Sequence, residues 1–272
     1  MKKLIQIFLT VRPINVLVSI IYSYLAYWYI GKENLGLYFA MATGFGLAAG
    51  NIINDIYDWK SDDINKAYKA RLYKIIGVKN AKIVYAFFTL LSVISAILSF
   101  QVAIIIVTLL ANILLYLYGK YGKYWGFLGN YTVAFLSALC IASPLITERN
   151  IVANKFEILS MLTFIAFAYS FMREWVKDFE DLKGDIRMGA KTGVIRMGVK
   201  RSYTLLRVYA YFLGILLLYI PLVYKNYFYF IWLLLYIPIL YYFLGRYSKR
   251  KMKLISSLLK VLFLSGLIVY FV

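Results

Sequence analysis

The chain has 272 residues, of which 63% are hydrophobic and 16% are charged, with a mean hydropathy of +0.73 and a formal net charge of +19. This composition excludes a soluble globular protein. The absence of histidine excludes His-based metal sites and Ser-His-Asp hydrolysis, and the single cysteine, Cys140, excludes a disulfide scaffold.

Apolar segments of roughly 17–25 residues recur along the whole chain, which is the length that crosses a bilayer as a helix. In chain order they are 12–30, 35–56, 82–99, 101–118, 127–146, 156–176, 203–223, 226–245 and 254–272. They predict an all-α, polytopic membrane protein with nine transmembrane helices. We expect one transmembrane domain over 1–272, with similar halves at about 1–125 and 126–245 and a terminal helix at 254–272.

The positive charges follow this predicted topology. With the N-terminus inside, 26 of the 31 Lys and Arg residues fall on one side, in the N-terminal segment and in the loops 59–82, 119–126, 173–207 and 246–253. The positive-inside rule then predicts a multi-pass protein of the cell membrane with this side in the cytoplasm. Such a face attracts anionic membrane lipids and phosphorylated substrates. A nucleic-acid partner is not expected, because the basic loops flank spans and show no binding motif.

The acidic residues are concentrated in two short windows. Nine of the twelve lie within 54–63 and 174–185. Both windows contain the pattern D-x-x-D-x-K-x-D, which begins at Asp55 and again at Asp178. Four predicted spans separate the two copies, so both should emerge on the same, cytoplasmic side. A long loop follows each copy, at about 59–81 and 178–202, and long loops in compact proteins are commonly lids or binding elements.

The spacing of these carboxylates suggests their chemistry. If each copy continues its preceding helix, positions i, i+3 and i+7 share one face. Two rows result: Asp55, Asp58 and Asp62 with Asn54 beside them, and Asp178, Asp181 and Asp185. Oxygen ligands of this kind select Mg²⁺, Mn²⁺ or Ca²⁺, and two rows facing across a cavity could hold two ions bridged by one diphosphate. The alternative, solvated helix ends, is disfavoured because carboxylates oppose the dipole at a helix C-terminus and repel one another at these spacings.

Both motifs resemble those of a known family. Asn54-Asp55-x-x-Asp58-x-x-x-Asp62 resembles the first aspartate-rich motif of the UbiA-type intramembrane prenyltransferases, and Asp178-x-x-Asp181-x-x-x-Asp185 is similar to their second. Further similarities are Arg12-Pro13-x-Asn15, Tyr116-x-Tyr118 followed by Lys120 or Lys123, Gly129-Asn130, Lys177, and Lys191-Thr192-Gly193. The segment 65–71 departs from the family, because it lacks the two prolines and the Ser-Gly expected there. Which of Lys66, Lys69, Arg71 and Lys74 meets the diphosphate therefore stays open.

The resemblance implies a fold, a reaction and a set of site residues. The fold is nine helices around a central cavity, and the reaction moves a prenyl group from its diphosphate to an acceptor with Mg²⁺ as cofactor. The implied metal ligands are Asn54, Asp55, Asp58, Asp62, Asp178, Asp181 and Asp185, of which Asp58, Asp62, Asp181 and Asp185 are the catalytic residues. The implied substrate-binding residues are Arg12, Asn15, Lys66, Arg71, Lys74, Tyr116, Tyr118, Lys120, Lys123, Asn130 and Lys177.

The acceptor is the remaining question. The compact chain, rich in Ile, Lys and Tyr, is most similar to archaeal family members that make ether lipids by joining geranylgeranyl diphosphate to the hydroxyl of geranylgeranylglyceryl phosphate. The alternative within the family is prenylation of an aromatic acid for quinone synthesis. A cation or solute transporter is a different class, but its ionisable groups should lie near the bilayer midplane. Here they cluster at one predicted membrane face.

Overall fold

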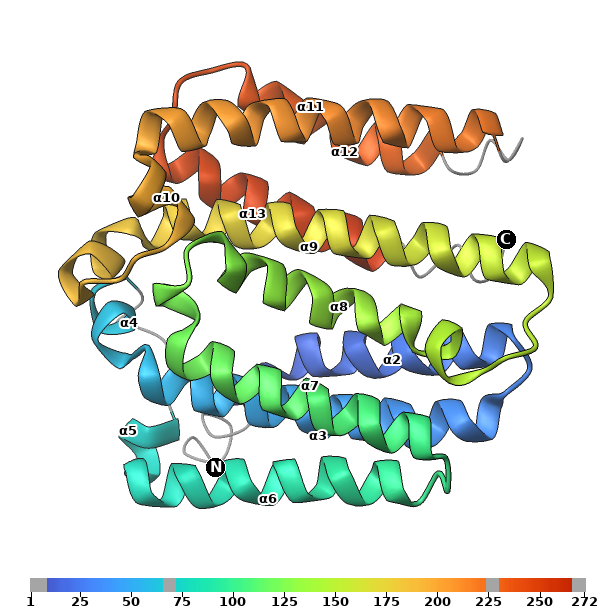
Figure 1. Ribbon diagram of the computed structural model, residues 1–272. Coiled ribbons are helices and arrows are strands. Elements are labelled where there is room, and N and C mark those ends of the chain that lie inside the picture. The colour runs from blue at the N-terminus through green and yellow to red at the C-terminus, as the bar shows by residue number, and fades with distance from the viewer. Residues whose placement is uncertain (1–8, 66–71, 224–229, 266–272) are drawn as a thin grey trace.

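The computed structural model describes residues 9–65, 72–223 and 230–265, apart from the side chains at 60–62 and 264, and it is a bundle of α-helices (Figure 1). The helices are α2 (Pro13–Tyr29), α3 (Glu33–Tyr57), α4 (Trp59–Asn65), α5 (Leu72–Ile76), α6 (Val78–Ile97), α7 (Val102–Tyr121), the 3₁₀ turn η1 (Gly122–Tyr124), α8 (Phe127–Thr147), α9 (Ala153–Met188), α10 (Gly193–Met197), α11 (Val199–Val223), α12 (Phe230–Phe243) and α13 (Lys249–Ser265). Within the described residues there is no β-strand, and a single isolated bridge joins Gly126 to Thr192.

Six of these helices are long and apolar enough to cross a membrane: α3, α6, α7 together with η1, α8, α9 and α11. The helices α2 and α13 have 17 residues each, and α12 has 14. Each predicted apolar run overlaps one of these helices in the described part of the chain. The prediction of an all-helical, multi-pass membrane protein is confirmed, and the count of nine crossings stays a prediction.

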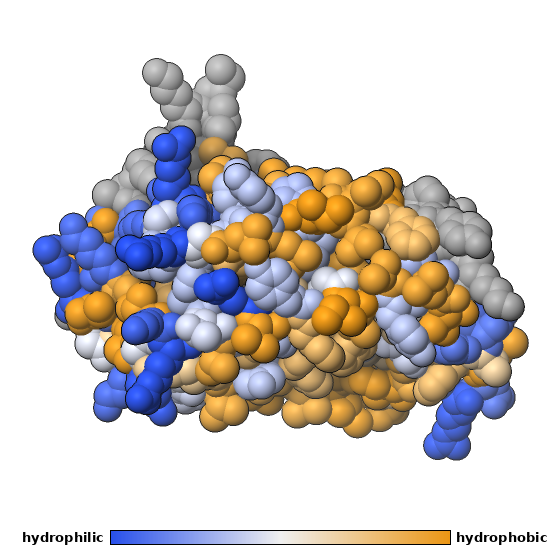
Figure 2. Space-filling view, turned by 90° about the horizontal axis from the view of Figure 1, so that it is seen from above, coloured by the Kyte–Doolittle hydropathy of each residue, from blue (hydrophilic) through white to orange (hydrophobic). Residues whose placement is uncertain are grey.

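The surface agrees with a bilayer environment. Large apolar side chains are exposed all along the bundle, among them Phe100, Ile215 and Tyr241. Figure 2 shows hydrophobic residues over the middle of the molecule and hydrophilic residues gathered mainly at the end that carries α4 and α10 in Figure 1. A soluble monomer rarely exposes so much apolar surface, because contact between apolar side chains and water is unfavourable.

The second acidic motif lies on a helix that is longer than predicted. We expected a span at 156–176 and a loop from about 178, but α9 continues without interruption to Met188. The helices α4 and α10 pack against this helix and support its extension. Gly189, with a left-handed φ of 76°, then ends it. Asp178, Asp181 and Asp185 therefore do share one helix, as the spacing requires.

The first acidic motif does not form one continuous row, and in this respect the prediction was wrong. The helix α3 ends at Tyr57, and Asp58 caps it by donating its backbone N–H to the carbonyl of Asn54, at 2.8 Å. A new helix, α4, carries Asp62. The change of direction has a packing reason, since α4 turns to lie against α9.

A close helix contact brings the end of α7 to the start of α8. A Cβ atom on Gly129 would lie 2.5 Å from the carbonyl oxygen of Gly122, which is closer than real atoms approach. Glycine is therefore required there, because it allows two backbones to touch. The contact fixes where η1 and the first turn of α8 stand relative to each other.

We expect the substitution Gly129→Ala to destabilise the protein by about 1–3 kcal/mol, because the two backbones must move apart. Thermal unfolding of the detergent-solubilised protein should show a lower midpoint. The control is Thr132→Ala one turn later on α8, where the hydroxyl bonds only the carbonyl of Leu128 in its own helix. An unchanged midpoint for the glycine variant would show that this contact does not hold the two helices.

Candidate active site

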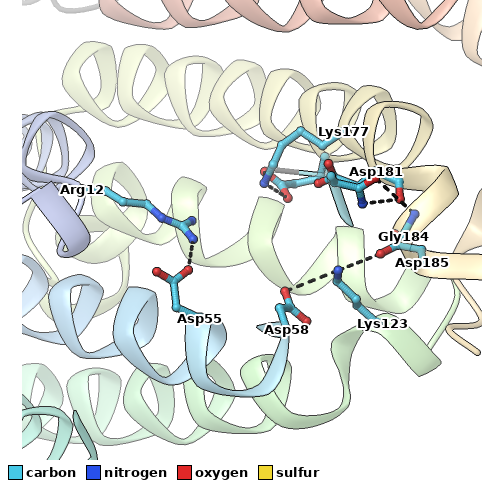
Figure 3. A network of polar contacts seen from close by, with 10 residues as sticks. Arg12, Asp55, Asp58, Lys123, Lys177, Asp181, Gly184 and Asp185 are labelled. Carbon is cyan, nitrogen blue, oxygen red and sulfur yellow. Dashed lines mark hydrogen bonds and ion pairs between the residues drawn. The ribbon is translucent and has the colours of Figure 1, made fainter. Parts of the chain in front are cut away.

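The two acidic motifs meet at one end of the bundle, and Lys123 joins them (Figure 3). Its ammonium lies 2.7 Å from an oxygen of Asp185, near the end of α9, and 3.6 Å from an oxygen of Asp58, at the end of α3. The side chains of Asp185 and Asp58 are only 2% and 11% exposed. Carboxylates as buried as these need compensating charge. A single cation therefore bridges one carboxylate of each motif.

A second ion pair ties the start of α2 to the first motif. A guanidinium nitrogen of Arg12 donates to Asp55 at 2.6 Å, and the Asp55 side chain is 2% exposed. The Arg12 backbone is in the left-handed region, with φ 56° and ψ 63°, directly before Pro13. Such a conformation is costly for a residue with a side chain, and it persists where the surrounding structure holds it. The Arg12–Asp55 bond and the backbone hydrogen bonds of Arg12 are contacts that hold it in place.

The second motif has its own polar partners. Asn130, at the start of α8, donates an amide hydrogen bond to Asp178 at 3.1 Å. One turn earlier on α9, Glu174 is buried and accepts bonds from Lys177 at 2.7 and 2.9 Å and from Arg173 at 3.1 Å. Sequence reasoning assigned no role to Glu174. The signal was present, because a residue four positions before Asp178 lies on the same helix face.

Tyr118 is within electrostatic range of this cluster. The charged groups near its hydroxyl are Asp58 of the first motif, Asp178 of the second, Glu174 on α9 and Arg12 just before α2. Tyr116 has other neighbours: its ring centroid lies 6.2 Å from that of Tyr85.

The two basic candidates at the end of α7 also separate. Lys123 is in the cluster, whereas the Lys120 ammonium lies over the ring of Tyr121, 4.8 Å from its centroid.

Several predicted site residues do not join the cluster within the described part of the chain, and others lie outside the residues that the structure describes. Asn15 is exposed on the first turn of α2, and Lys74 pairs with Asp63 at 2.5 Å. The backbone of Asp62 is described, but its side chain is not. Lys66, Lys69 and Arg71 fall outside the described residues. The backbone of Asp181 accepts a hydrogen bond from Asn65 of α4, at 2.7 Å.

The side chains present suit a magnesium ion. Within the described residues, no three carboxylate or cysteine side chains gather closely enough to hold a metal by themselves. Mg²⁺ does not require this, since it takes one or two carboxylates together with water and phosphate oxygens. Asp58 and Asp185 offer such a pair, and the space between them already receives the positive charge of Lys123. The donor set, made of carboxylate and amide oxygens, is the hard kind that Mg²⁺ prefers.

An all-helical membrane bundle with two carboxylate motifs joined at one end defines a class of intramembrane enzymes. The chain belongs to the UbiA prenyltransferase family, whose model matches residues 16–267. The resemblance of its motifs to that family is thereby confirmed.

Named relatives and solved structures agree with the family. Digeranylgeranylglyceryl phosphate synthase of Methanobrevibacter smithii is 34% identical over 202 residues, which are 71% of this chain and 69% of that protein. The protein of the same name from Sulfolobus acidocaldarius is 30% identical over 181 residues, 65% of this chain and 62% of that protein.

Among solved structures, one described as digeranylgeranylglyceryl phosphate synthase in membranes has a TM-score of 0.70 at 24% identity. The match covers 99% of this chain and 98% of that chain. A UbiA homologue from Archaeoglobus fulgidus bound to GPP and Mg²⁺ has a TM-score of 0.62 at 16% identity, covering 98% of this chain and all of its own. These likenesses show that the fold is shared.

Proposed function

We propose that the protein transfers a geranylgeranyl group from geranylgeranyl diphosphate to the hydroxyl of geranylgeranylglyceryl phosphate, in archaeal ether-lipid synthesis. The observation that carries this proposal is the meeting of the two motifs, where Lys123 lies between Asp58 and Asp185. Relatives named for this activity match most of the chain. The family's structures with Mg²⁺ and prenyl diphosphates support the same cofactor and the same class of donor.

The basic residues of the site bind the diphosphate and balance its charge. Arg12, Lys123 and Lys177 converge from α2, η1 and α9, and each is bonded to a carboxylate in this structure. A bound diphosphate competes with these carboxylates for the same donors, because charge-assisted hydrogen bonds to phosphate are strong. Mg²⁺, when bound, adds positive charge at the diphosphate and makes it a better leaving group.

The transfer then needs an environment that keeps water out. The bond between the first prenyl carbon and the diphosphate oxygen breaks, and its electrons leave with the diphosphate. The oxygen of the acceptor hydroxyl forms the new ether bond, and its proton passes to the released diphosphate, which is a base. An allylic cation must be shielded from water during this step. We propose that Tyr118, whose hydroxyl lies within electrostatic range of charged groups of both motifs, contributes an aromatic face that stabilises this cation.

We also propose the placement of the site in the cell. Nine crossings with the motifs on the cytoplasmic side of the cell membrane are supported by the 26 basic residues predicted for that side. The proposed metal ligands are Asn54 and the six aspartates of the motifs. Of these, Asp58 and Asp185 both pair with the ammonium of Lys123 in this structure.

The test is a transfer assay with the purified protein in lipid nanodiscs. Each reaction contains Mg²⁺ and geranylgeranyl diphosphate together with one acceptor: geranylgeranylglyceryl phosphate, glycerol phosphate or 4-hydroxybenzoate. The products are identified by mass spectrometry. We expect the diether product with geranylgeranylglyceryl phosphate alone. Transfer only to the aromatic acid would replace the proposed acceptor, and no transfer by a folded protein would overturn the proposal.

A further inference from the structure

Among the described side chains of the short helix α4, that of Asn65 hydrogen-bonds the backbone of α9 at two points. Asn65, the last residue of α4, donates an amide hydrogen bond to the backbone carbonyl of Asp181, at 2.7 Å. Its amide oxygen accepts a hydrogen bond from the backbone N–H of Gly184, at 3.1 Å. The two partners are 116 and 119 residues away in the chain, and Gly184 is buried.

The chemistry of this contact is specific to asparagine. The contact uses a donor and an acceptor on one short side chain, and a primary amide provides both. Serine is too short to span two backbone groups separated along a helix, and alanine has neither group. Gly184 carries no side chain to stand in the way, which is a common use of glycine where another segment approaches the backbone closely.

The location of the contact gives it a consequence for the site. The bonds fall on the stretch of α9 between Asp181 and Asp185, which both belong to the second motif. Asp62 of the first motif lies three residues before Asn65 in α4. The amide therefore connects the segment that carries the last aspartate of one motif to the backbone that carries two aspartates of the other.

We infer that Asn65 is a positioning residue, which sets the distance between the two acidic motifs and thereby the affinity of the site for the metal–diphosphate pair. This inference rests on the proposed function. Asn65 need not touch the metal or the substrate. Its two hydrogen bonds keep α4 in register on α9, because each fixes a different backbone group of the same turn.

The first test measures metal binding without turnover. Mn²⁺ is titrated by electron paramagnetic resonance into the full-length protein in nanodiscs, in the presence of geranylgeranyl thiodiphosphate, whose carbon–sulfur bond resists ionisation. We expect Asn65→Ala to bind Mn²⁺ about tenfold to thirtyfold more weakly, from the loss of two neutral hydrogen bonds. In the transfer assay the half-saturating Mg²⁺ concentration should rise by a similar factor, while the rate at saturating Mg²⁺ changes by less than about threefold.

The second test measures the geometry directly. Spin labels are attached to cysteines introduced at Trp59 on α4 and Ile186 on α9, both exposed, in a Cys140→Ala background. We expect the distribution of distances between the labels to broaden in the Asn65→Ala variant. If that variant does not fold, Asn65→Ser replaces it, with the same expectation.

The control and the contradicting outcomes separate this inference from the proposed function. Asn80→Ala removes an amide that bonds only the nearby carbonyl of Ile76 on an exposed surface, and it should behave as the wild type. Unchanged Mn²⁺ affinity and an unchanged distance distribution in the Asn65 variant overturn the positioning role. Two results can occur together: the wild-type protein transfers no prenyl group, and the Asn65→Ala variant binds Mn²⁺ more weakly than the wild type. This combination overturns the proposed function and leaves the positioning role intact.

Discussion

Replacing either Asp58 or Asp185 by Asn will lower the rate of prenyl transfer by at least about 100-fold, the size of effect seen when one essential electrostatic group is removed from an active site. These two carboxylates come from different motifs and share Lys123 as their partner. The amide keeps the shape and removes the charge, so one motif can no longer help to hold a divalent cation against the other. The measurement is the initial rate of transfer at saturating donor and acceptor.

The matched control is Asp63→Asn, which removes the same charge five residues after Asp58. The Asp63 side chain is 38% exposed and pairs with Lys74 at 2.5 Å, whereas Lys123 pairs with Asp58 and Asp185. Transfer by this variant should stay within about twofold of the wild type, because exposed ion pairs contribute little. Thermal unfolding of all three variants identifies any loss of rate that comes from misfolding. Normal rates for both Asp58→Asn and Asp185→Asn would show that these two carboxylates are not required for prenyl transfer.

Removing divalent metal with a chelator will reduce prenyl transfer to background. The reason is the charge of the donor: a diphosphate leaving group needs positive charge, and the nearby Arg12, Lys123 and Lys177 are already engaged with carboxylates. Adding Mg²⁺ in excess of the chelator should restore the full rate. The same experiment with labelled geranylgeranyl diphosphate should show weaker donor binding in the absence of metal.

The control for chelation is the stability of the protein itself. Its helical circular dichroism and its unfolding midpoint should not change when metal is removed, because the described core consists of packed apolar side chains such as Leu206, Tyr236 and Phe243. Full transfer in the presence of excess chelator would contradict a metal-dependent mechanism and would require the basic residues alone to stabilise the leaving group.

The sequence predicts the architecture well because both signals that carry it are local. Apolar runs of membrane length identify helices irrespective of tertiary contacts. The spacing of Asp178, Asp181 and Asp185 correctly places them on one helix, and the repeated pattern correctly indicates that two acidic motifs come together. The family resemblance follows from the same short patterns, and the match over residues 16–267 confirms it.

What the sequence does not predict depends on contacts between distant segments. The break after Tyr57 arises because α4 packs on α9, and no pattern near residue 58 indicates this. Lys120 and Lys123 are equivalent candidates by residue type, and the close contact of Gly129 with Gly122 places Lys123 beside the carboxylates. Asn65 lies in the segment 65–71 that departs from the family pattern, and its two partners are more than a hundred residues away in the chain, so no local pattern indicates its role.

The length of α9 has a consequence for product release. Its 36 residues extend over about 54 Å, whereas the hydrocarbon layer is about 30 Å thick and membrane helices tilt by no more than about 40°. At least one end of this helix must therefore extend beyond the hydrocarbon layer. Asp185 lies three residues before the C-terminal end of the helix. Hydrophilic residues gather at the end with α4 and α10, which pack on α9, so we expect this end to be the one that leaves (Figure 2). We then expect pyrophosphate to be released on the water side and the lengthened lipid to stay in the bilayer. Release on opposite sides of the interface would separate the two products without a channel across the membrane.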